Sequence, residues 1–285
     1  MQPHTHPHEA ATLPLKRPQK ISPDLPIGVF DSGLGGLTIV RAMRKLLPQE
    51  SILYFGDIAR LPYGTKSKEQ ILRFSVENTQ FLLHKGIKAL VIACNSSASA
   101  AYDFLRRTSD LPVVDVISPA VEEALRVTRS GRIGVIGTQA TIDSGAYQKA
   151  LRAKNPKLSV VSAACPLLVP IVEEGAVPQK IQKAAVEHYL APLKKHRMDT
   201  LILGCTHYPM LKKVLQAAVG PRVTLVDSAR PCVAKLRAHL EQSGLAAPLK
   251  KRGRLHVFVS DLPRSFTRLG ENFLQEKLGR VTVVR

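Results

Sequence analysis

The sequence predicts an α/β fold built from mainly parallel sheets, and three features of the chain support this class. First, short apolar segments rich in Val and Ile alternate with longer stretches of helical character. Second, the apolar segments are continuous, as strands buried on both faces of a parallel sheet are. Third, two parts of the chain resemble each other. Alternating strands and helices give parallel sheets with right-handed crossovers, and two similar parts give two lobes.

The apolar segments are the predicted strands. Their Val and Ile side chains are β-branched and fit the pleated surface of a sheet. The predicted strands cover residues 27–30, 52–55, 89–93, 113–116, 133–136, 158–163, 201–203, 223–226 and 255–259.

The predicted helices lie between these strands. The helix at 37–47 begins after a glycine-rich turn and stops before Pro48. The helix at 68–84 has apolar residues at helical spacing and is followed by Gly86, a typical residue for a helix C-terminus. The other predicted helices cover residues 96–105, 119–128, 140–153, 178–196, 210–218 and 231–242.

The internal resemblance links two pairs of segments. Residues 27–32 (IGVFDS) resemble residues 133–138 (IGVIGT), and residues 91–95 (VIACN) resemble residues 202–206 (ILGCT). In both parts a strand ends in a cysteine followed by Asn or Thr. We therefore expect two pseudo-symmetric lobes, each with a sheet flanked by helices, and an active site in the cleft between them.

The expected domain boundaries follow this division. Residues 1–24 are predicted to be a flexible N-terminal tail. The first lobe is expected to contain residues 25–117 and 227–285, with Asp31 and Cys94. The second is expected to contain residues 118–226, with Glu173 and Cys205.

Composition excludes several classes of protein. Apolar residues make up 45% and charged residues 22% of the 285 residues, which is typical of a globular chain. No apolar stretch approaches the roughly 18–20 residues of a membrane span, and the N-terminus lacks the apolar block of a signal peptide. The four cysteines form no C-x-x-C pair. We expect a cytoplasmic protein with reduced thiols that does not associate with membranes.

The net charge of +19 predicts anionic partners. The chain contains no helix-turn-helix, RNA-recognition or zinc-finger motif, so we expect at most nonspecific nucleic-acid binding through a basic surface. The basic run Lys250, Lys251, Arg252 and Arg254 is interpreted as a solvated surface loop.

Two cysteines at matching strand ends form the candidate catalytic pair. Ligands of open α/β sheets bind beyond the carboxyl ends of the strands, where Cys94 and Cys205 are predicted to lie. If the lobes face each other, the two thiols meet across one cleft. One thiolate can then remove a proton from carbon while the other thiol delivers a proton to the opposite face, which inverts the centre.

Other sites fit the sequence less well. The glycine turn at 33–38 resembles a dinucleotide fingerprint, but Thr38 replaces its third glycine. A metal site would need a second close pair of Cys or His beside Cys205 and His207, and the chain has none. Cys165 and Cys232 are interpreted as packing residues.

A hydrolase that uses Cys205 as nucleophile and His207 as base is a further alternative. It would leave Cys94 without a role. A nucleic-acid-binding protein would explain the positive charge by phosphate contacts and would bind less tightly as salt increases.

Four motifs together resemble the glutamate racemases, the cofactor-independent members of the aspartate/glutamate racemase group. They are residues 27–36 (IGVFDSGLGG), 62–64 (PYG), 93–95 (ACN) and 204–209 (GCTHYP). The resemblance implies interconversion of L- and D-glutamate, which supplies D-glutamate for peptidoglycan and thus for the bacterial cell wall and cell shape. It also implies glutamate as the substrate, no cofactor, no metal ligands and a homodimer.

The resemblance assigns roles to individual residues. Cys94 would take the α-proton of D-glutamate with help from Asp31, and Cys205 that of L-glutamate with help from Glu173 and His207. The implied substrate-binding residues are Asp31, Ser32, Tyr63, Gly64, Asn95, Ser96, Thr206 and His207.

The chain departs from the family pattern after Cys94. Ser96 and Ser97 stand where the family usually has Thr and Ala, so the hydroxyl is kept but the rotamer restriction of threonine is lost. Glu173 could instead begin a helix as one of a solvated pair with Glu174. Racemisation of aspartate or another acidic amino acid by the same two-thiol route is the nearest alternative activity.

Overall fold

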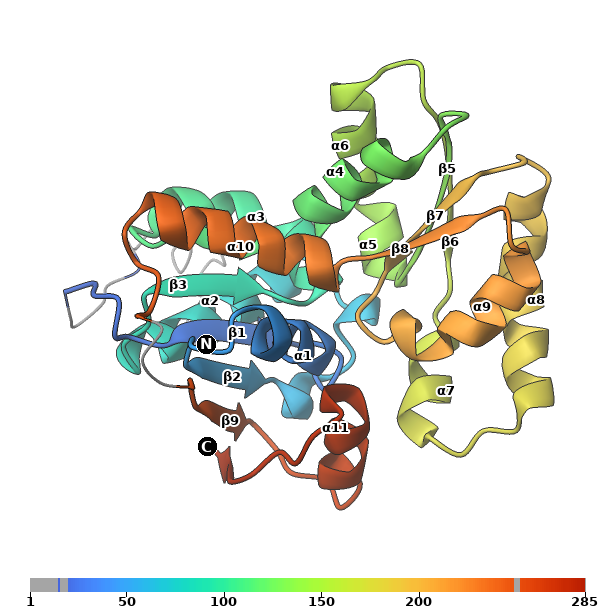
Figure 1. Ribbon diagram of the computed structural model, residues 1–285. Helices are drawn as coiled ribbons and strands as arrows, with labels where there is room; N and C mark the ends of the chain where they lie inside the picture. Colours follow the sequence, from blue (N-terminus) through green and yellow to red (C-terminus); the bar gives the residue numbers. More distant parts are fainter. Residues whose placement is uncertain (1–14, 16–19, 249–251, 285) are drawn as a thin grey trace, which may run out of the picture.

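The computed structural model describes residue 15, residues 20–248 and residues 252–284, and it contains two α/β lobes with parallel sheets (Figure 1). The fold class predicted from the sequence is confirmed. Buried apolar residues of both lobes belong to one continuous core cluster, so the lobes pack on each other. None of the helices in the described part of the chain is long and apolar enough to cross a membrane.

The first lobe contains a six-stranded sheet in the order β10-β9-β2-β1-β3-β4. Every strand pair in it is parallel. Its strands are β1 (Ile27–Asp31), β2 (Ile52–Gly56), β3 (Ala89–Ile92), β4 (Val113–Asp115), β9 (Leu255–Val259) and β10 (Val281–Val283). Because β1 is central, its C-terminal Asp31 lies in the middle of the carboxyl edge.

Five helices flank this sheet in two groups. Helix α2 packs against α3, whereas α1 packs against α10 and α11. The helices are α1 (Leu37–Leu46), α2 (Lys68–His84), α3 (Asn95–Thr108), α10 (Ala229–Gln242) and α11 (Phe266–Leu274).

The second lobe contains a four-stranded parallel sheet in the order β6-β5-β7-β8. Its strands are β5 (Arg132–Gly137), β6 (Ser159–Ala164), β7 (Thr200–Gly204) and β8 (Thr224–Asp227). Helix α4 (Ile117–Val127) contacts both β7 and β8 here and α10 of the first lobe. The other helices are α5 (Gln139–Asp143), α6 (Ala146–Lys154), α7 (Leu168–Glu174), α8 (Gln179–Lys194) and α9 (Lys212–Val219).

The central strand pairs of the two sheets have equivalent registers. Strand β1 pairs with β3 so that Ile27 lies opposite Ala89, and β5 pairs with β7 so that Ile133 lies opposite Thr200. Cys94 follows Ala89 by the same five positions by which Cys205 follows Thr200. The internal resemblance in the sequence therefore corresponds to equivalent positions in two sheets.

Several predicted elements differ in detail from the structure. The single helix expected at 140–153 is two helices, because Gly145 between α5 and α6 adopts a left-handed φ of 65°. The helix expected at 210–218 begins as a 3₁₀ turn, η4 (Tyr208–Leu211), before α9. The segment at 158–163 was expected to be buried on both faces, but β6 is half-buried because it is an edge strand.

Two α-helices and one strand of the described chain were not predicted: α7, α11 and β10. The 3₁₀ turns η2 (Ile58–Arg60) and η3 (Tyr63–Thr65) were not predicted either. Glu173 lies near the end of α7, so the alternative in which it begins a helix with Glu174 is wrong.

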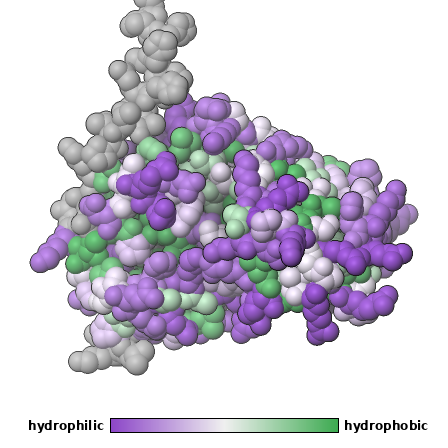
Figure 2. Space-filling model, turned by 90° about the horizontal axis from the view of Figure 1, so that it is seen from above, coloured by the Kyte–Doolittle hydropathy of each residue, from purple (hydrophilic) through white to green (hydrophobic). Residues whose placement is uncertain are grey.

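The predicted N-terminal tail lies mostly outside the described residues. Of its described part, Leu15 is buried in the core cluster, and the carbonyl of Pro23 accepts a hydrogen bond from Lys88 Nζ at 2.6 Å. Lys250 and Lys251 of the basic run also lie outside the described residues, while Arg252 and Arg254 are exposed. Hydrophilic side chains are spread widely over the face in Figure 2, in keeping with the high charge of the sequence.

Candidate active site

The carboxyl ends of the two sheets face one cavity of about 390 Å³. The structure brings together at this cavity all the site residues predicted from the sequence. They are Asp31, Ser32, Tyr63, Gly64, Cys94, Asn95, Ser96, Glu173, Cys205, Thr206 and His207.

The first lobe contributes a thiol and a carboxylate to the cavity. Cys94 is 5% exposed and occupies the N-cap position of α3, and its thiol donates to Ser32 Oγ at 3.6 Å. Burial and the charge of Asp31 raise the pKa of Cys94 to about 12, although hydrogen bonds with Ser97 and Ser32 partly offset this. Cys94 is therefore a thiol at neutral pH.

The Asp31 carboxylate is fixed by the glycine-rich turn that follows β1. Its Oδ2 accepts hydrogen bonds from the backbone N–H groups of Gly36 at 2.9 Å and Gly33 at 3.4 Å. Its Oδ1 is buried without a hydrogen-bond partner among the described residues. Because buried carboxylate oxygens are costly to leave unpaired, Oδ1 is ready to accept a donor from a ligand.

The second lobe contributes a chain of three groups. His207 Nδ1 lies 3.8 Å from Cys205 Sγ, and its Nε2 lies 2.9 Å from Glu173 Oε1. Burial lowers the pKa of His207, but the hydrogen bonds to Cys205 and Glu173 outweigh burial and raise it to about 10. The imidazole is therefore a cation at neutral pH and holds a positive charge beside Cys205.

Hydroxyl and amide groups also line the cavity. Ser96 Oγ lies 2.9 Å from Thr138 Oγ1, which in turn lies 2.9 Å from Thr141 Oγ1. Asn95 Nδ2 is buried and without a hydrogen-bond partner in the described part of the chain. These groups suit carboxylates, which accept hydrogen bonds.

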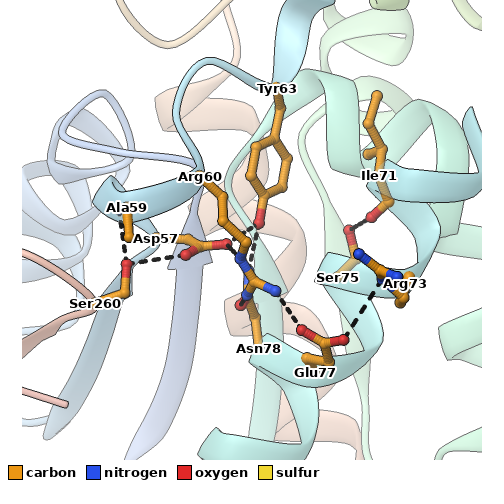
Figure 3. A network of polar contacts seen from close by, with 10 residues as sticks. All are labelled: Asp57, Ala59, Arg60, Tyr63, Ile71, Arg73, Ser75, Glu77, Asn78 and Ser260. Atoms are coloured by element: carbon orange, nitrogen blue, oxygen red, sulfur yellow. Dashed lines mark hydrogen bonds and ion pairs between the residues drawn. The ribbon is translucent and has the colours of Figure 1, made fainter. Parts of the chain in front are cut away.

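One wall of the cavity is the segment 61–65, which is tied to the sheet by Asp57 (Figure 3). The Tyr63 hydroxyl donates to Asp57 Oδ2 and accepts from Asn78 Nδ2, so it is committed to this network. Arg60 Nε and Ser260 Oγ also donate to Asp57. Tyr63 thus lines the cavity while its hydroxyl is engaged away from it.

Close backbone approach brings the lobes together at Gly35. A Cβ atom there would lie 2.2 Å from Thr206 Oγ1 and 2.6 Å from His207 Nδ1, so the position requires glycine. A Cβ at Gly64 would likewise lie 2.7 Å from Thr138 Cβ. Both glycines of the first lobe therefore set how closely the second lobe approaches.

The cavity also contains residues that the sequence analysis did not place in the site. They are Leu61, Pro62, Thr65, Thr138, Gln139, Pro166, Val169 and Pro170. Thr138 had a usable signal, because the internal resemblance matches it to Ser32 at the end of the equivalent strand. Val169 and Pro170 lie on α7, which was not predicted.

Cys165 and Cys232 lie outside the cavity lining. Both are buried free thiols, and Cys165 donates to the carbonyl of Ala163 at 3.6 Å. Their interpretation as packing residues agrees with this burial. Among the described residues, no group of three or more His, Cys, Asp or Glu side chains could hold a metal ion.

Comparison with known proteins identifies the family. The sequence model of the Asp/Glu/Hydantoin racemase family matches residues 37–236. A glutamate racemase of Geobacter metallireducens is 49% identical over 256 residues, which cover 90% of this chain and 94% of that protein.

Solved structures give the same result. A glutamate racemase isoform of Bacillus anthracis superposes with a TM-score of 0.88 at 39% identity, over 92% of this chain and 97% of that one. A glutamate racemase of Francisella tularensis in complex with D-glutamate gives 0.87 at 38% identity, over 92% and 98%. The chain therefore belongs to the Asp/Glu/Hydantoin racemase family, and the prediction of a racemase of this family, an isomerase, is confirmed.

Proposed function

We propose that the chain interconverts L- and D-glutamate without a cofactor, using Cys94 and Cys205 as opposed acid/base groups. The observation that carries this proposal is that both cysteines line one cavity and come from equivalent strand ends of different lobes. Two bases on opposite sides of one carbon are what an inversion requires.

The reaction balances as two proton transfers. In the D-to-L direction the Cys94 thiolate removes the α-proton, and the Cys205 thiol donates a proton to the opposite face of the carbanion. Cys94 ends as a thiol and Cys205 as a thiolate, and proton exchange with water restores the starting state. The L-to-D direction reverses these roles.

Asp31 couples substrate binding to the acidity of Cys94. Together with burial, the Asp31 charge raises the pKa of Cys94. The ammonium group of a bound amino acid would pair with the free Oδ1 of Asp31 and counter this charge. Binding would then favour the Cys94 thiolate where it is needed.

His207 and Glu173 have the corresponding role beside Cys205. The imidazolium, held by Glu173, stabilises a thiolate at Cys205 through its charge and can return a proton to it. Asn95, Ser96 and Thr206 would hold the two substrate carboxylates and spread the negative charge that develops at the α-carbon.

The wider role follows from the product. The proposed enzyme supplies D-glutamate for peptidoglycan in the bacterial cytoplasm, where thiols remain reduced; all four cysteines are free. The relative from Francisella tularensis is described in complex with D-glutamate, which supports this choice of substrate. A homodimer and nonspecific nucleic-acid binding remain predictions.

The test follows the α-proton by NMR in D2O, with L- and D-glutamate supplied separately and no cofactor added. We expect the α-proton signal to disappear and the opposite enantiomer to grow, as checked by chiral chromatography. Deuterium should enter the product before it appears in recovered substrate, since each thiol serves one face. Absence of exchange with either enantiomer would refute the glutamate assignment, and aspartate is then the first alternative substrate.

Cys205 contacts His207, and His207 contacts Glu173. A cysteine hydrolase triad has the same series of contacts, in which Glu173 would orient the base. The two proposals differ in what they require of Cys94. A hydrolase would keep its activity in Cys94→Ser, whereas the two-thiol racemase would lose it.

A further inference from the structure

A tyrosine of the second lobe reaches into the first lobe and contacts the candidate substrate-binding amide. The Tyr147 hydroxyl, on α6, donates to Asn95 Oδ1, on α3, at 2.7 Å. Both side chains are buried, Tyr147 at 0% and Asn95 at 2% exposure. Tyr147 does not line the cavity, and no motif of the sequence pointed to it.

The contact decides which way the Asn95 amide faces. A carboxamide has an acceptor on one side and donors on the other. Because Oδ1 accepts from Tyr147, Nδ2 is directed elsewhere, and it is buried without a partner among the described residues. Asn95 also lines the cavity, so the unpaired donor belongs to a residue of the site.

The Tyr147 hydroxyl keeps the proton that this contact needs. Burial raises the pKa of Tyr147, so the phenol is neutral at physiological pH and can donate. Its proton is directed at Asn95 Oδ1, the acceptor side of the amide.

We propose that Tyr147 is a positioning residue that fixes the Asn95 amide so that Nδ2 donates to a substrate carboxylate. The inference rests on the proposed function, and it deepens that function by naming a residue which acts on the substrate through another. The contact also crosses the fold, since Tyr147 lies on α6 of the second lobe and Asn95 on α3 of the first. The donor is therefore presented correctly only when the lobes are packed.

The decisive experiment is a double-mutant cycle with Tyr147→Phe and Asn95→Ala, measured on racemisation of both enantiomers. In Tyr147→Phe we expect KM to rise about tenfold with little change in kcat, because a hydrogen bond made equally in the ground and transition states is weakened. Added to Asn95→Ala, the same substitution should have no further effect on KM. A merely structural role would give additive losses.

Tyr208→Phe is the matched control. Tyr208 is equally buried, and its hydroxyl donates to the backbone carbonyl of Cys165 at 2.9 Å. It should lose a comparable amount of stability while KM changes less than twofold. If Tyr147→Phe does not fold, Asn95→Asp is the second variant, since it keeps the acceptor for the Tyr147 hydroxyl and lacks the Nδ2 donor. It should raise KM about tenfold, and an unchanged KM would overturn the proposal.

A binding measurement distinguishes failure of this inference from failure of the proposed function. If the wild type binds D-glutamate in calorimetry but does not racemise it, the proposed function fails. The double-mutant cycle is then measured on the Kd for D-glutamate instead of KM. Unchanged KM and Kd in Tyr147→Phe, or additive effects with Asn95→Ala, would overturn the positioning role. Failure of the wild type to bind glutamate would overturn both.

Discussion

His207 Nε2 lies 2.9 Å from Glu173 Oε1, and this contact joins the η4 turn to the end of α7 in the second lobe. It holds a protonated imidazole in a site where burial alone would favour the neutral ring. The charge on His207 therefore depends on its two partners, Cys205 and Glu173.

The first prediction concerns stability against pH. His207 has its pKa raised from 6.5 to about 10 in the folded state, so the folded state retains a proton that the unfolded chain releases. This contribution to the free energy of unfolding is fully present below pH 6.5 and is lost as pH rises through about 10. In Glu173→Gln we expect a smaller fall in the urea midpoint between pH 6.5 and 10. Equal slopes in both proteins would contradict the role of Glu173.

The second prediction concerns the thiols. Cys94→Ser and Cys205→Ser should each reduce kcat/KM for racemisation by about a thousandfold, the usual contribution of a positioned acid or base. Far-UV circular dichroism and the urea midpoint should remain near wild type. Cys232→Ala, at a buried cysteine outside the cavity lining, is the control and should remain active. Full racemisation by either serine variant would exclude the two-thiol mechanism.

The third prediction concerns the buried ion pair of Lys88 and Glu50. Lys88 Nζ lies 2.6 Å from Glu50 Oε2, and both side chains are 0% exposed. Glu50 Oε1 also accepts from the backbone N–H of Ala247. Lys88→Met should lower the free energy of unfolding by about 3–5 kcal/mol, because it leaves a buried carboxylate without its cation.

Urea unfolding measures this loss. Lys88→Met combined with Glu50→Leu should recover much of it, because no unpaired charge remains. Arg126→Ala, which breaks the exposed pair with Glu123, is the control and should leave the midpoint unchanged. A small effect of Lys88→Met alone would show that the carboxylate finds another partner.

The fourth prediction concerns Gly35. In Gly35→Ala the new methyl group would overlap Thr206 and His207, so the second lobe must move away from the first. We expect kcat/KM to fall about a hundredfold from misplacement of the second thiol, with the secondary structure retained. In Gly220→Ala nothing lies within 4 Å of the new Cβ. That control should lose about 1 kcal/mol of stability because of its positive φ, and should keep its activity.

The sequence was sufficient for the fold class and for the long elements. Continuous apolar segments identified β1, β3, β5 and β7, because a strand buried on both faces has no polar side to confuse the pattern. The same rule misjudged β6, since its position at the sheet edge depends on strand order, which no local pattern contains. The short elements α7 and β10 carry too few residues to show a period.

The reactive residues of the candidate site were predicted from the sequence, whereas the residues that position them were not. Residues with reactive side chains at strand ends, such as Cys94 and Asp31, could be selected from chemistry and position. Tyr147 could not, because it acts through a contact between α6 and α3 that depends on how two lobes pack. The close approach at Gly35 is invisible in sequence for the same reason.

The unlike groups beside the two thiols have a kinetic consequence for the proposed reaction. Mirror-image substrates in water have equal free energies, so the equilibrium constant of racemisation is unity and kcat/KM must be the same in both directions. The cavity itself is not a mirror, because a carboxylate accompanies Cys94 whereas an imidazolium accompanies Cys205. Any preference that this asymmetry creates in binding one enantiomer must therefore be matched by an equal and opposite change in its turnover. The two similar lobes supply two comparable routes for the proton. The unlike groups beside the thiols determine, for each enantiomer, how a common kcat/KM is composed of kcat and KM.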